Sequence, residues 1–230
     1  MLEFRDVAIT LGDFRLEADF TVDPGARVAV IGPSGSGKST LLALVSGFLR
    51  PDRGAVLWQG RDLADVPPGQ RPVSVLFQDQ NLFPHLSVAQ NVGLGLRPDL
   101  RLSPEQRAAV ARALDRVGLA GMEARRPAQL SGGQQSRVAL ARVLLRARPI
   151  LLLDEPFGAL GPALKREMLD LLAQIAGDTG ATVLMVTHDP DDARAFAGQT
   201  IVVEGGRAHP PQPTGPLLHD PPPALRDYLG

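Results

Sequence analysis

The chain has 230 residues, 44% of them hydrophobic and 21% charged, which is enough for one sizeable α/β core with a lobe inserted in it. Its formal net charge is −1, so no overall positive field favours nucleic acid as a partner. The absence of cysteine excludes disulfides, cysteine-ligated zinc and a thiol nucleophile. The acidic start and the lack of an apolar run of roughly 18 residues lead us to expect neither a secretory signal nor a membrane span.

The first part of the chain alternates short apolar runs with turn residues. A helix is predicted from Lys38 to about Phe48, because Pro51 and Gly54 then interrupt the pattern. Strands are predicted from the β-branched and aromatic runs before and after this helix. The predicted strands are 7–10, 18–22, 27–31, 55–59 and 73–77.

Helical periodicity and capping signals dominate from Ser87 to about Arg148, which predicts a helical lobe. Within it, Ser103 is followed by proline and glutamine in the order typical of a helix start. Apolar runs at 150–154 and 182–187 each end in polar residues, as expected of parallel strands whose carboxyl ends form a ligand crevice. The proline-rich segment 208–223 is predicted to be an extended tail with little chemistry.

A glycine-rich segment directly after a predicted strand matches the phosphate-binding pattern G-x-x-x-x-G-K-[ST]. Its glycines let the backbone surround phosphate oxygens with N–H donors at a helix start, whose dipole favours anions. Lys38 adds a positive charge for the β and γ phosphates, and Ser39 offers a hydroxyl for Mg²⁺. A plain glycine turn is the alternative, but the order of strand, loop, lysine, hydroxyl and helix favours a nucleotide site. The segment consists of Gly32, Pro33, Ser34, Gly35, Ser36, Gly37, Lys38, Ser39 and Thr40.

A second glycine segment, Leu130-Ser131-Gly132-Gly133-Gln134, precedes a predicted helix. Its serine and glycines offer a hydroxyl and backbone donors at the helix start, so it suits a second anion site as well as an ordinary glycine-containing cap. A phosphate loop alone leaves kinases, GTPases and motors open as functions. A chain that carries both segments resembles the nucleotide-binding subunit of an ABC transporter.

This resemblance implies an α/β fold with a P-loop NTPase (RecA-like) core, an antiparallel β subdomain and an inserted α-helical signature subdomain. It implies a single nucleotide-binding domain over residues 1–230. The expected parts are a catalytic core with the β subdomain at 1–86 and 150–207, the helical subdomain at 87–149, and the tail at 208–230.

Two adjacent acids, Asp154 and Glu155, follow the apolar run at 150–153. Successive side chains of a strand face opposite ways, so one carboxylate can serve a metal and the other a water, although an exposed acidic turn is the alternative. The resemblance assigns Asp154 to Mg²⁺ and Glu155 to the attacking water as general base. It also implies that Gln78 contacts Mg²⁺ and the water, and that His188 contacts the γ phosphate.

The resemblance implies partners as well. The segment Ser131 to Gln134 would close on ATP held by a second copy, giving a head-to-tail homodimer with two ATP molecules at one interface. Phe83 and Leu86 resemble the surface that receives a short helix from a transmembrane permease, and they equally suit the core of the helical lobe. A periplasmic solute-binding protein would be an indirect partner, and the chain would lie at the cytoplasmic face of the bacterial inner membrane as a peripheral subunit.

Two positions depart from the family pattern. Leu11 stands where an aromatic residue usually stacks on adenine, so Phe14 is the expected stacking residue. Gly161 stands where an aspartate usually follows the acidic pair, which affects communication between the two ATP sites. Because Lys38 and Glu155 are retained, we expect ATP hydrolysis with Mg²⁺.

The segment 76–96 resembles the ATP-binding subunit of bacterial thiamine importers. Sulfate and polyamine importers, which are alternatives together with iron importers, generally carry a regulatory domain after the cassette, and only about 25 residues follow Gly205 here. A DNA-repair ATPase would need a long coiled coil or a zinc module between the two glycine segments, and a translation factor of this family would normally contain two cassettes. A small-molecule kinase would explain Lys38 but not the segment from Leu130 to Gln134.

Overall fold

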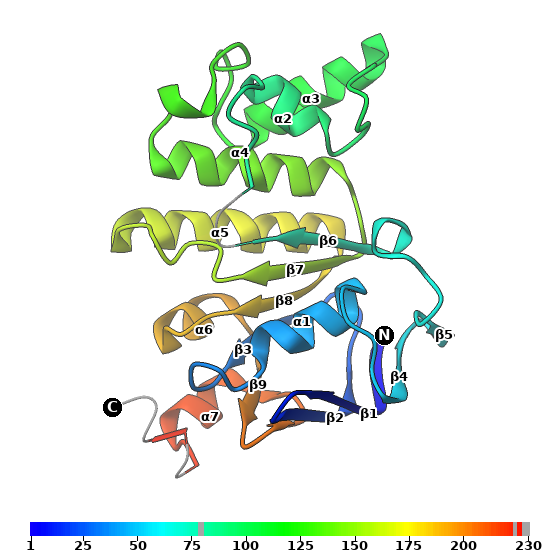
Figure 1. Cartoon of the computed structure of the whole chain (residues 1–230). Coiled ribbons are helices and arrows are strands. Elements are labelled where there is room, and N and C mark those ends of the chain that lie inside the picture. Colours follow the sequence, from blue (N-terminus) through cyan, green and yellow to red (C-terminus); the bar gives the residue numbers. More distant parts are fainter. Residues whose placement is uncertain (78–80, 223–224, 227–230) are drawn as a thin grey trace.

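A computed structural model describes residues 1–77, 81–222 and 225–226 (Figure 1). The described strands form one sheet in the order β5-β4-β1-β2-β10-β9-β3-β8-β7-β6, and β11 pairs with β9. The strands are β1 (Leu2–Leu11), β2 (Phe14–Val22), β3 (Arg27–Ile31), β4 (Arg53–Trp58), β5 (Arg61–Asp62), β6 (Val73–Leu76), β7 (Ile150–Asp154), β8 (Thr182–Val186), β9 (Gln199–Glu204), β10 (Arg207–Ala208) and β11 (Gln212–Pro213). The helices are α1 (Lys38–Ser46), α2 (Val88–Gly93), α3 (Pro104–Arg116), α4 (Gly132–Leu145), α5 (Pro162–Thr179), α6 (Pro190–Phe196) and α7 (Thr214–His219), with 3₁₀ turns at Pro68–Gln70 and Pro127–Gln129.

The parallel strands β6, β7, β8, β3 and β9 make the centre of the molecule. Their apolar residues alternate between two cores, because successive side chains leave opposite faces of a sheet. On β7, Ile150 and Leu152 pack toward α1 and the antiparallel strands, while Leu151 and Leu153 pack toward α4, α5 and α6. Both faces are therefore covered, and a ligand can approach only at the strand ends.

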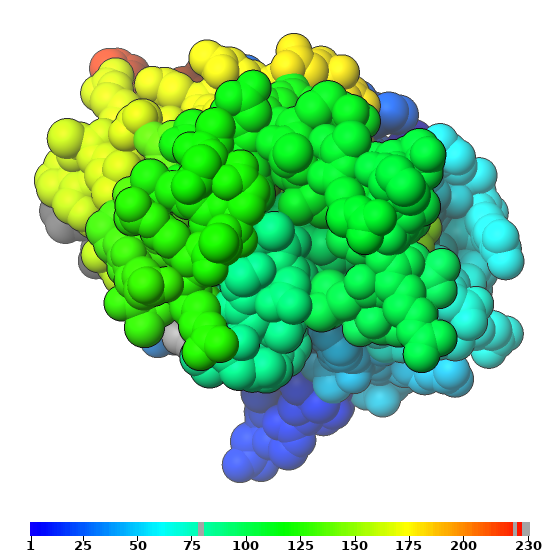
Figure 2. Space-filling view, turned by 90° about the horizontal axis from the view of Figure 1, so that it is seen from above, coloured from blue at the N-terminus to red at the C-terminus, as the bar shows by residue number. Residues whose placement is uncertain are grey.

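A separate helical layer, α2, α3 and α4, has its own apolar core and covers the face of the molecule seen in Figure 2. Each of its helices begins at a serine whose hydroxyl accepts the backbone N–H of a glutamine three residues later, and that glutamine side chain accepts the serine N–H in return. These capping boxes at Ser87, Ser103 and Ser131 satisfy donors that a helix start otherwise leaves unpaired. In Figure 1 this layer lies across α5 from β7.

The expected extended tail is wrong for much of segment 208–223. Residues 207–208 pair with β2 and β9, residues 212–213 pair with β9, and α7 follows. Leu217 and Leu218 are buried in the main core, and the hydroxyls of Thr200 and Thr214 lie 2.9 Å apart. Proline did not prevent the formation of α7, because Pro216 lies in its first turn, where the N–H that proline lacks would have no intrahelical partner.

The other element boundaries differ from the sequence predictions by a few residues. Strands β1 and β2 are longer than predicted, since their polar residues lie on an exposed face that breaks the apolar run. Helix α1 starts at Lys38 as predicted and ends at Ser46, because Gly47 adopts a left-handed conformation with φ of 86°. Within the described residues, no helix combines the length and apolar character that crossing a membrane requires.

Candidate functional site

The loop between β3 and α1 is shaped by glycines that no other residue could replace without strain. Gly32 and Gly37 have φ of 150° and 106°, in the range that favours glycine. A Cβ on Gly32 would lie 2.0 Å from the Val203 carbonyl oxygen, and one on Gly37 would lie 2.6 Å from Cζ of Phe14. The loop therefore lies directly against β9 and β2, with its backbone at the start of α1.

Lys38, the first residue of α1, turns its side chain back into this loop. Its Nζ donates hydrogen bonds to the carbonyl oxygens of Gly32 at 2.7 Å and Pro33 at 2.8 Å. Burial lowers the pKa of Lys38 below 10.5, and the nearby carboxylates of Glu155 and Asp154 oppose this shift. The ammonium group is thus held among carbonyl oxygens and beside two carboxylates, where it can bind an anion.

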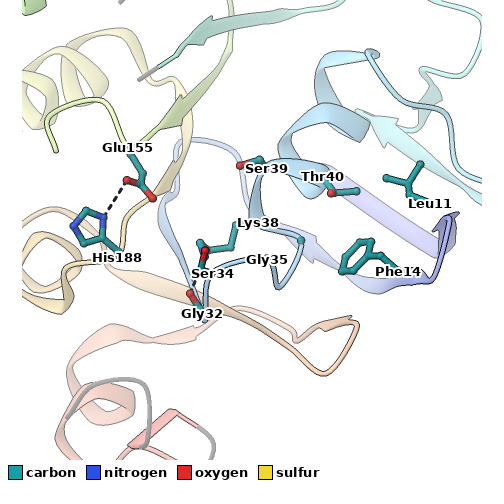
Figure 3. A pocket seen from close by; sticks show the side chains of 11 residues that line it. Leu11, Phe14, Gly32, Ser34, Gly35, Lys38, Ser39, Thr40, Glu155 and His188 are labelled. Atoms are coloured by element: carbon teal, nitrogen blue, oxygen red, sulfur yellow. Dashed lines mark hydrogen bonds and ion pairs between the residues drawn. The ribbon is translucent and has the colours of Figure 1, made fainter. Parts of the chain in front are cut away.

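Figure 3 shows the pocket that these residues line, of about 600 Å³. The loop and α1 form its middle, the hairpin of β1 and β2 forms one side, and the ends of β7 and β8 form the other. It thus lies at the carboxyl ends of parallel strands, as the sequence predicts. The lining residues are Leu11, Phe14, Gly32, Ser34, Gly35, Gly37, Lys38, Ser39, Thr40, Glu155 and His188.

Asp154, the last residue of β7, lies close to Ser39 and Lys38 at the start of α1. Burial raises the pKa of Asp154 above 3.8, with Glu155 adding to the rise, while the Ser39 hydroxyl and Lys38 oppose it. A carboxylate and a hydroxyl oxygen next to a phosphate-binding loop are hard ligands of the kind that Mg²⁺ prefers. The residues present therefore fit Mg²⁺.

Glu155 follows in a conformation that is uncommon for a residue with a side chain. Its φ is 45°, and its backbone N–H donates to the Val186 carbonyl at 3.1 Å. The side chain turns into the pocket, where Oε2 lies 3.0 Å from Nδ1 of His188 (Figure 3). The ends of β7 and β8 thus bring a carboxylate and an imidazole together, which suits acid–base chemistry on a water.

The two candidates for contact with adenine, Leu11 and Phe14, both lie on the β1–β2 side of the pocket (Figure 3). Leu11 is exposed, whereas Phe14 is half-buried and its ring rests on Gly37. Phe14 therefore offers an aromatic surface close to the phosphate loop, and its predicted role in stacking remains a prediction.

The second glycine segment lies outside this pocket. Ser131 is the N-cap of α4, and its hydroxyl accepts the N–H of Gln134 at 3.3 Å. A Cβ on Gly133 would lie 2.3 Å from Leu164 of α5, whereas one on Gly132 would meet nothing within 4 Å. A side chain at Gly133 would thus have to displace Leu164, whereas one at Gly132 would not, and Ser131 and Gly132 face outward.

The two remaining predicted positions are Gln78 and Gly161. Gln78 lies outside the described residues. Gly161 is the N-cap of α5, where it provides no side-chain hydrogen bond, and a Cβ there would meet nothing within 4 Å.

The sequence prediction missed a cluster next to His188. Lys165 of α5 bonds to Asp189 and Asp192 around the start of α6. A lysine that lies 24 residues from its partner leaves no local spacing signal, although Asp189 could have been found as an N-cap before Pro190.

Residues 16–158 match the family model described as ABC transporter. The chain belongs to the ABC transporter family. The match begins on β2 and extends past Glu155, so it includes the phosphate loop, the helical layer and the acidic pair.

Three curated relatives of this ABC transporter chain carry the same name. The Thiamine import ATP-binding protein ThiQ of Cereibacter sphaeroides is 65% identical over 230 residues, which is 100% of both chains. The protein of the same name from Ruegeria sp. is 58% identical over 100% of both chains, and that from Yersinia pseudotuberculosis is 50% identical over 95% of this chain and 92% of its own.

Solved structures agree with this assignment. The dimeric post-hydrolysis state of the ATP-binding cassette MJ0796 with ADP and Pi is 30% identical, with a TM-score of 0.78 over 93% of this chain and 99% of that one. A second dimeric structure of MJ0796 is 31% identical, with a TM-score of 0.79 over the same shares. The predicted P-loop NTPase fold and the prediction of an ABC-type ATPase are therefore confirmed.

Proposed function

We propose that this chain hydrolyses ATP in a head-to-tail homodimer and that this reaction drives thiamine import through a membrane permease. The observation that carries the proposal is the pocket that joins the phosphate loop, Lys38 and the Glu155–His188 pair. The choice of thiamine is supported by the name that the three curated relatives share. The relative from Cereibacter sphaeroides is 65% identical over the whole chain.

In this proposal the ATP phosphates lie along the loop amides, and Lys38 exchanges its hydrogen bonds with Gly32 and Pro33 for phosphate oxygens. Glu155 orients the attacking water and accepts its proton, since its carboxylate faces the pocket. His188, 3.0 Å from that carboxylate, donates to the γ phosphate through its second ring nitrogen. Phe14 stacks on adenine at the other end of the pocket.

Mg²⁺ would be held by Ser39 and Asp154, with Gln78 as a further proposed ligand. When bound, Mg²⁺ neutralises charge that develops on the phosphates during transfer. Among the described residues, no group of three or more histidines, aspartates and glutamates could hold a metal by itself. This donor set agrees with a cation whose remaining ligands are substrate phosphates and water.

The outward-facing Ser131 and Gly132 support the proposed homodimer, because the second anion site is then completed by another copy. Exposed aromatic residues support the proposed contact with a permease. Phe83 is 46% exposed, so it is not a core residue of the helical layer, and Phe48 and Phe77 lie exposed with ring centroids 6.2 Å apart. A periplasmic solute-binding protein would deliver the solute to that permease.

The test combines turnover by the purified chain with uptake of labelled thiamine by cells that lack the gene. Wild-type protein should restore uptake, and Glu155→Gln should not, because its ATP turnover should fall by at least about 100-fold. Glu17→Gln is the control and should restore uptake, since Glu17 forms an exposed ion pair with Arg15 and does not line the pocket.

Two outcomes would contradict different parts of the proposal. Unchanged turnover in Glu155→Gln would reject Glu155 as the base. Normal turnover by the wild-type chain together with thiamine uptake that does not depend on the gene would reject thiamine as the solute and leave the hydrolytic site intact.

A further inference from the structure

A lysine on α5 reaches across to the start of α6. The Nζ of Lys165 donates hydrogen bonds to Asp189 Oδ2 at 2.8 Å and Asp192 Oδ2 at 3.3 Å. The side chains of Lys165 and Asp192 are only 16% and 14% exposed, so this is not a surface ion pair that solvent would weaken.

The same carboxylates fix the backbone on both sides of His188. The Thr187 hydroxyl donates to Asp192 Oδ2 at 3.0 Å and accepts the Asp189 N–H at 3.0 Å. Asp189 Oδ1 in turn accepts the N–H of Asp191, which caps α6. His188 is therefore carried between two residues whose positions depend on the cluster.

The contacts of Lys165 connect the two chain segments that carry Glu155 and His188. Glu155 directly follows β7, and the segment after it leads into α5, which carries Lys165. His188 lies just after β8, and α6 begins at Pro190. Glu155 and His188 meet at 3.0 Å, and Lys165 makes a second connection between the same two parts of the chain.

The side chain of His188 is 58% exposed, so packing restrains its ring only in part. Its distance from Glu155 then also depends on the backbone from Thr187 to Asp189. Small displacements of a group that takes part in positioning or proton transfer reduce rates far more than they reduce binding.

We propose that Lys165 is a positioning residue for ATP hydrolysis, which holds His188 beside Glu155 through Asp189 and Asp192. This inference rests on the proposed function of the pocket. Lys165 does not line that pocket, so it acts through His188 and not on the nucleotide.

The first experiment measures kcat and KM for ATP with the purified full chain. Lys165→Met should lower kcat by about tenfold or more and leave KM within about threefold, because nucleotide binding relies on the loop and not on the cluster. Lys165→Arg should restore most of kcat, since it keeps a cation that can bridge two carboxylates. Arg166→Met, at an exposed neighbouring position on α5, should match the wild type.

The second experiment separates positioning from general stabilisation by a double-mutant cycle with His188→Ala. If Lys165 acts through His188, the double variant should have the kcat of His188→Ala alone. Independent, multiplying losses would overturn the inference, as would wild-type kcat in Lys165→Met. If Lys165→Met does not fold, Lys165→Gln, which keeps a hydrogen-bond donor, replaces it in both experiments.

Glu155→Gln distinguishes the failure of this inference from failure of the proposed function. Loss of turnover in Glu155→Gln with normal turnover in Lys165→Met would reject only the role of Lys165. Normal turnover in Glu155→Gln would reject Glu155 as the base, and with it the part of the proposed function on which this inference rests.

Discussion

Asp154 is a residue at which function and stability oppose each other. Burial raises its pKa above 3.8, so between 3.8 and the raised value the folded carboxyl binds more protons than the unfolded one. The free energy of unfolding contributed by this group therefore falls as the pH rises through that window. Above that window the carboxyl is ionised in both states, and the full cost of its burial is present.

Asp154→Asn should therefore raise the unfolding temperature at neutral pH, and this advantage should shrink as the pH is lowered toward 3.8. ATP turnover should fall on the order of 100-fold, because the proposed Mg²⁺ ligand is lost. Thermal unfolding over a pH series checks the first statement, with the exposed Asp65→Asn as control. A lower unfolding temperature for Asp154→Asn at neutral pH would contradict the argument.

At the scale of single residues, the sequence located groups whose function follows from a local pattern. Lys38, Asp154 and Glu155 were found because loop and strand signals surround them. Lys165 was missed because its partners belong to a helix 24 residues away, and only the packing of α5 on α6 brings them together. Gln78 was predicted to belong to the same site as Lys38, Asp154 and Glu155, but it lies outside the described part of the chain.

Among the elements, α1 depends on a buried arginine that follows it. Arg71 donates to the carbonyl oxygens of Leu44 and Val45 at the end of α1, and to those of Leu63 and Val66. A helix leaves its last carbonyls without intrahelical partners, and the guanidinium supplies them. Burial lowers the pKa of Arg71, as expected for a cation that is withdrawn from water.

Arg71→Met should lower the free energy of unfolding by about 3 kcal/mol, because buried acceptors lose charged hydrogen-bond donors. Urea denaturation measures this loss. The exposed Arg61→Met should stay within about 0.5 kcal/mol of the wild type. An equal, small effect of both substitutions would show that the carbonyl groups near Arg71 find other partners.

At this scale the sequence predicted elements whose start or end has a chemical signal. The serine caps of α2, α3 and α4 and the apolar runs of β3, β7 and β8 are of this kind. Proline content was a poor guide for segment 208–223, because the burial of Leu217 and Leu218 against α6 and β9 outweighs it. Such tertiary packing has no counterpart in local composition.

For the whole molecule, the proposed dimer joins the ATP pocket of one chain to the Ser131 helix start of the other. With ATP, Glu155→Gln should accumulate as a dimer in size-exclusion chromatography, because hydrolysis no longer reopens it. The double variant Glu155→Gln/Ser131→Arg should remain monomeric, because an arginine at Ser131 would fill the outward-facing helix start. This would be so even though ATP still binds the loop of each chain.

A matched control is Glu155→Gln/Ser103→Arg. Ser103 makes the same kind of capping box in the same helical layer, so its loss costs a similar amount of stability, about 1 kcal/mol. This control should still dimerise with ATP. Equal dimerisation of both double variants would contradict the proposed role of Ser131.

The overall architecture could be predicted because the two glycine segments belong to a known family, and the family fixes the order of its parts. The position of Ser131 outside the ATP pocket of its own chain could not be derived from spacing. That position depends on how α4 packs across α5 from the sheet.

The two glycines of the second segment, Gly132 and Gly133, have different surroundings. A side chain at Gly133 would meet Leu164 inside one chain, while Gly132 has open space before it. A side chain at Gly132 would leave an isolated chain folded and equally resistant to heat. A survey of variants by expression or melting temperature would score such a change as harmless, although in the proposed dimer its effect would fall on the neighbouring copy.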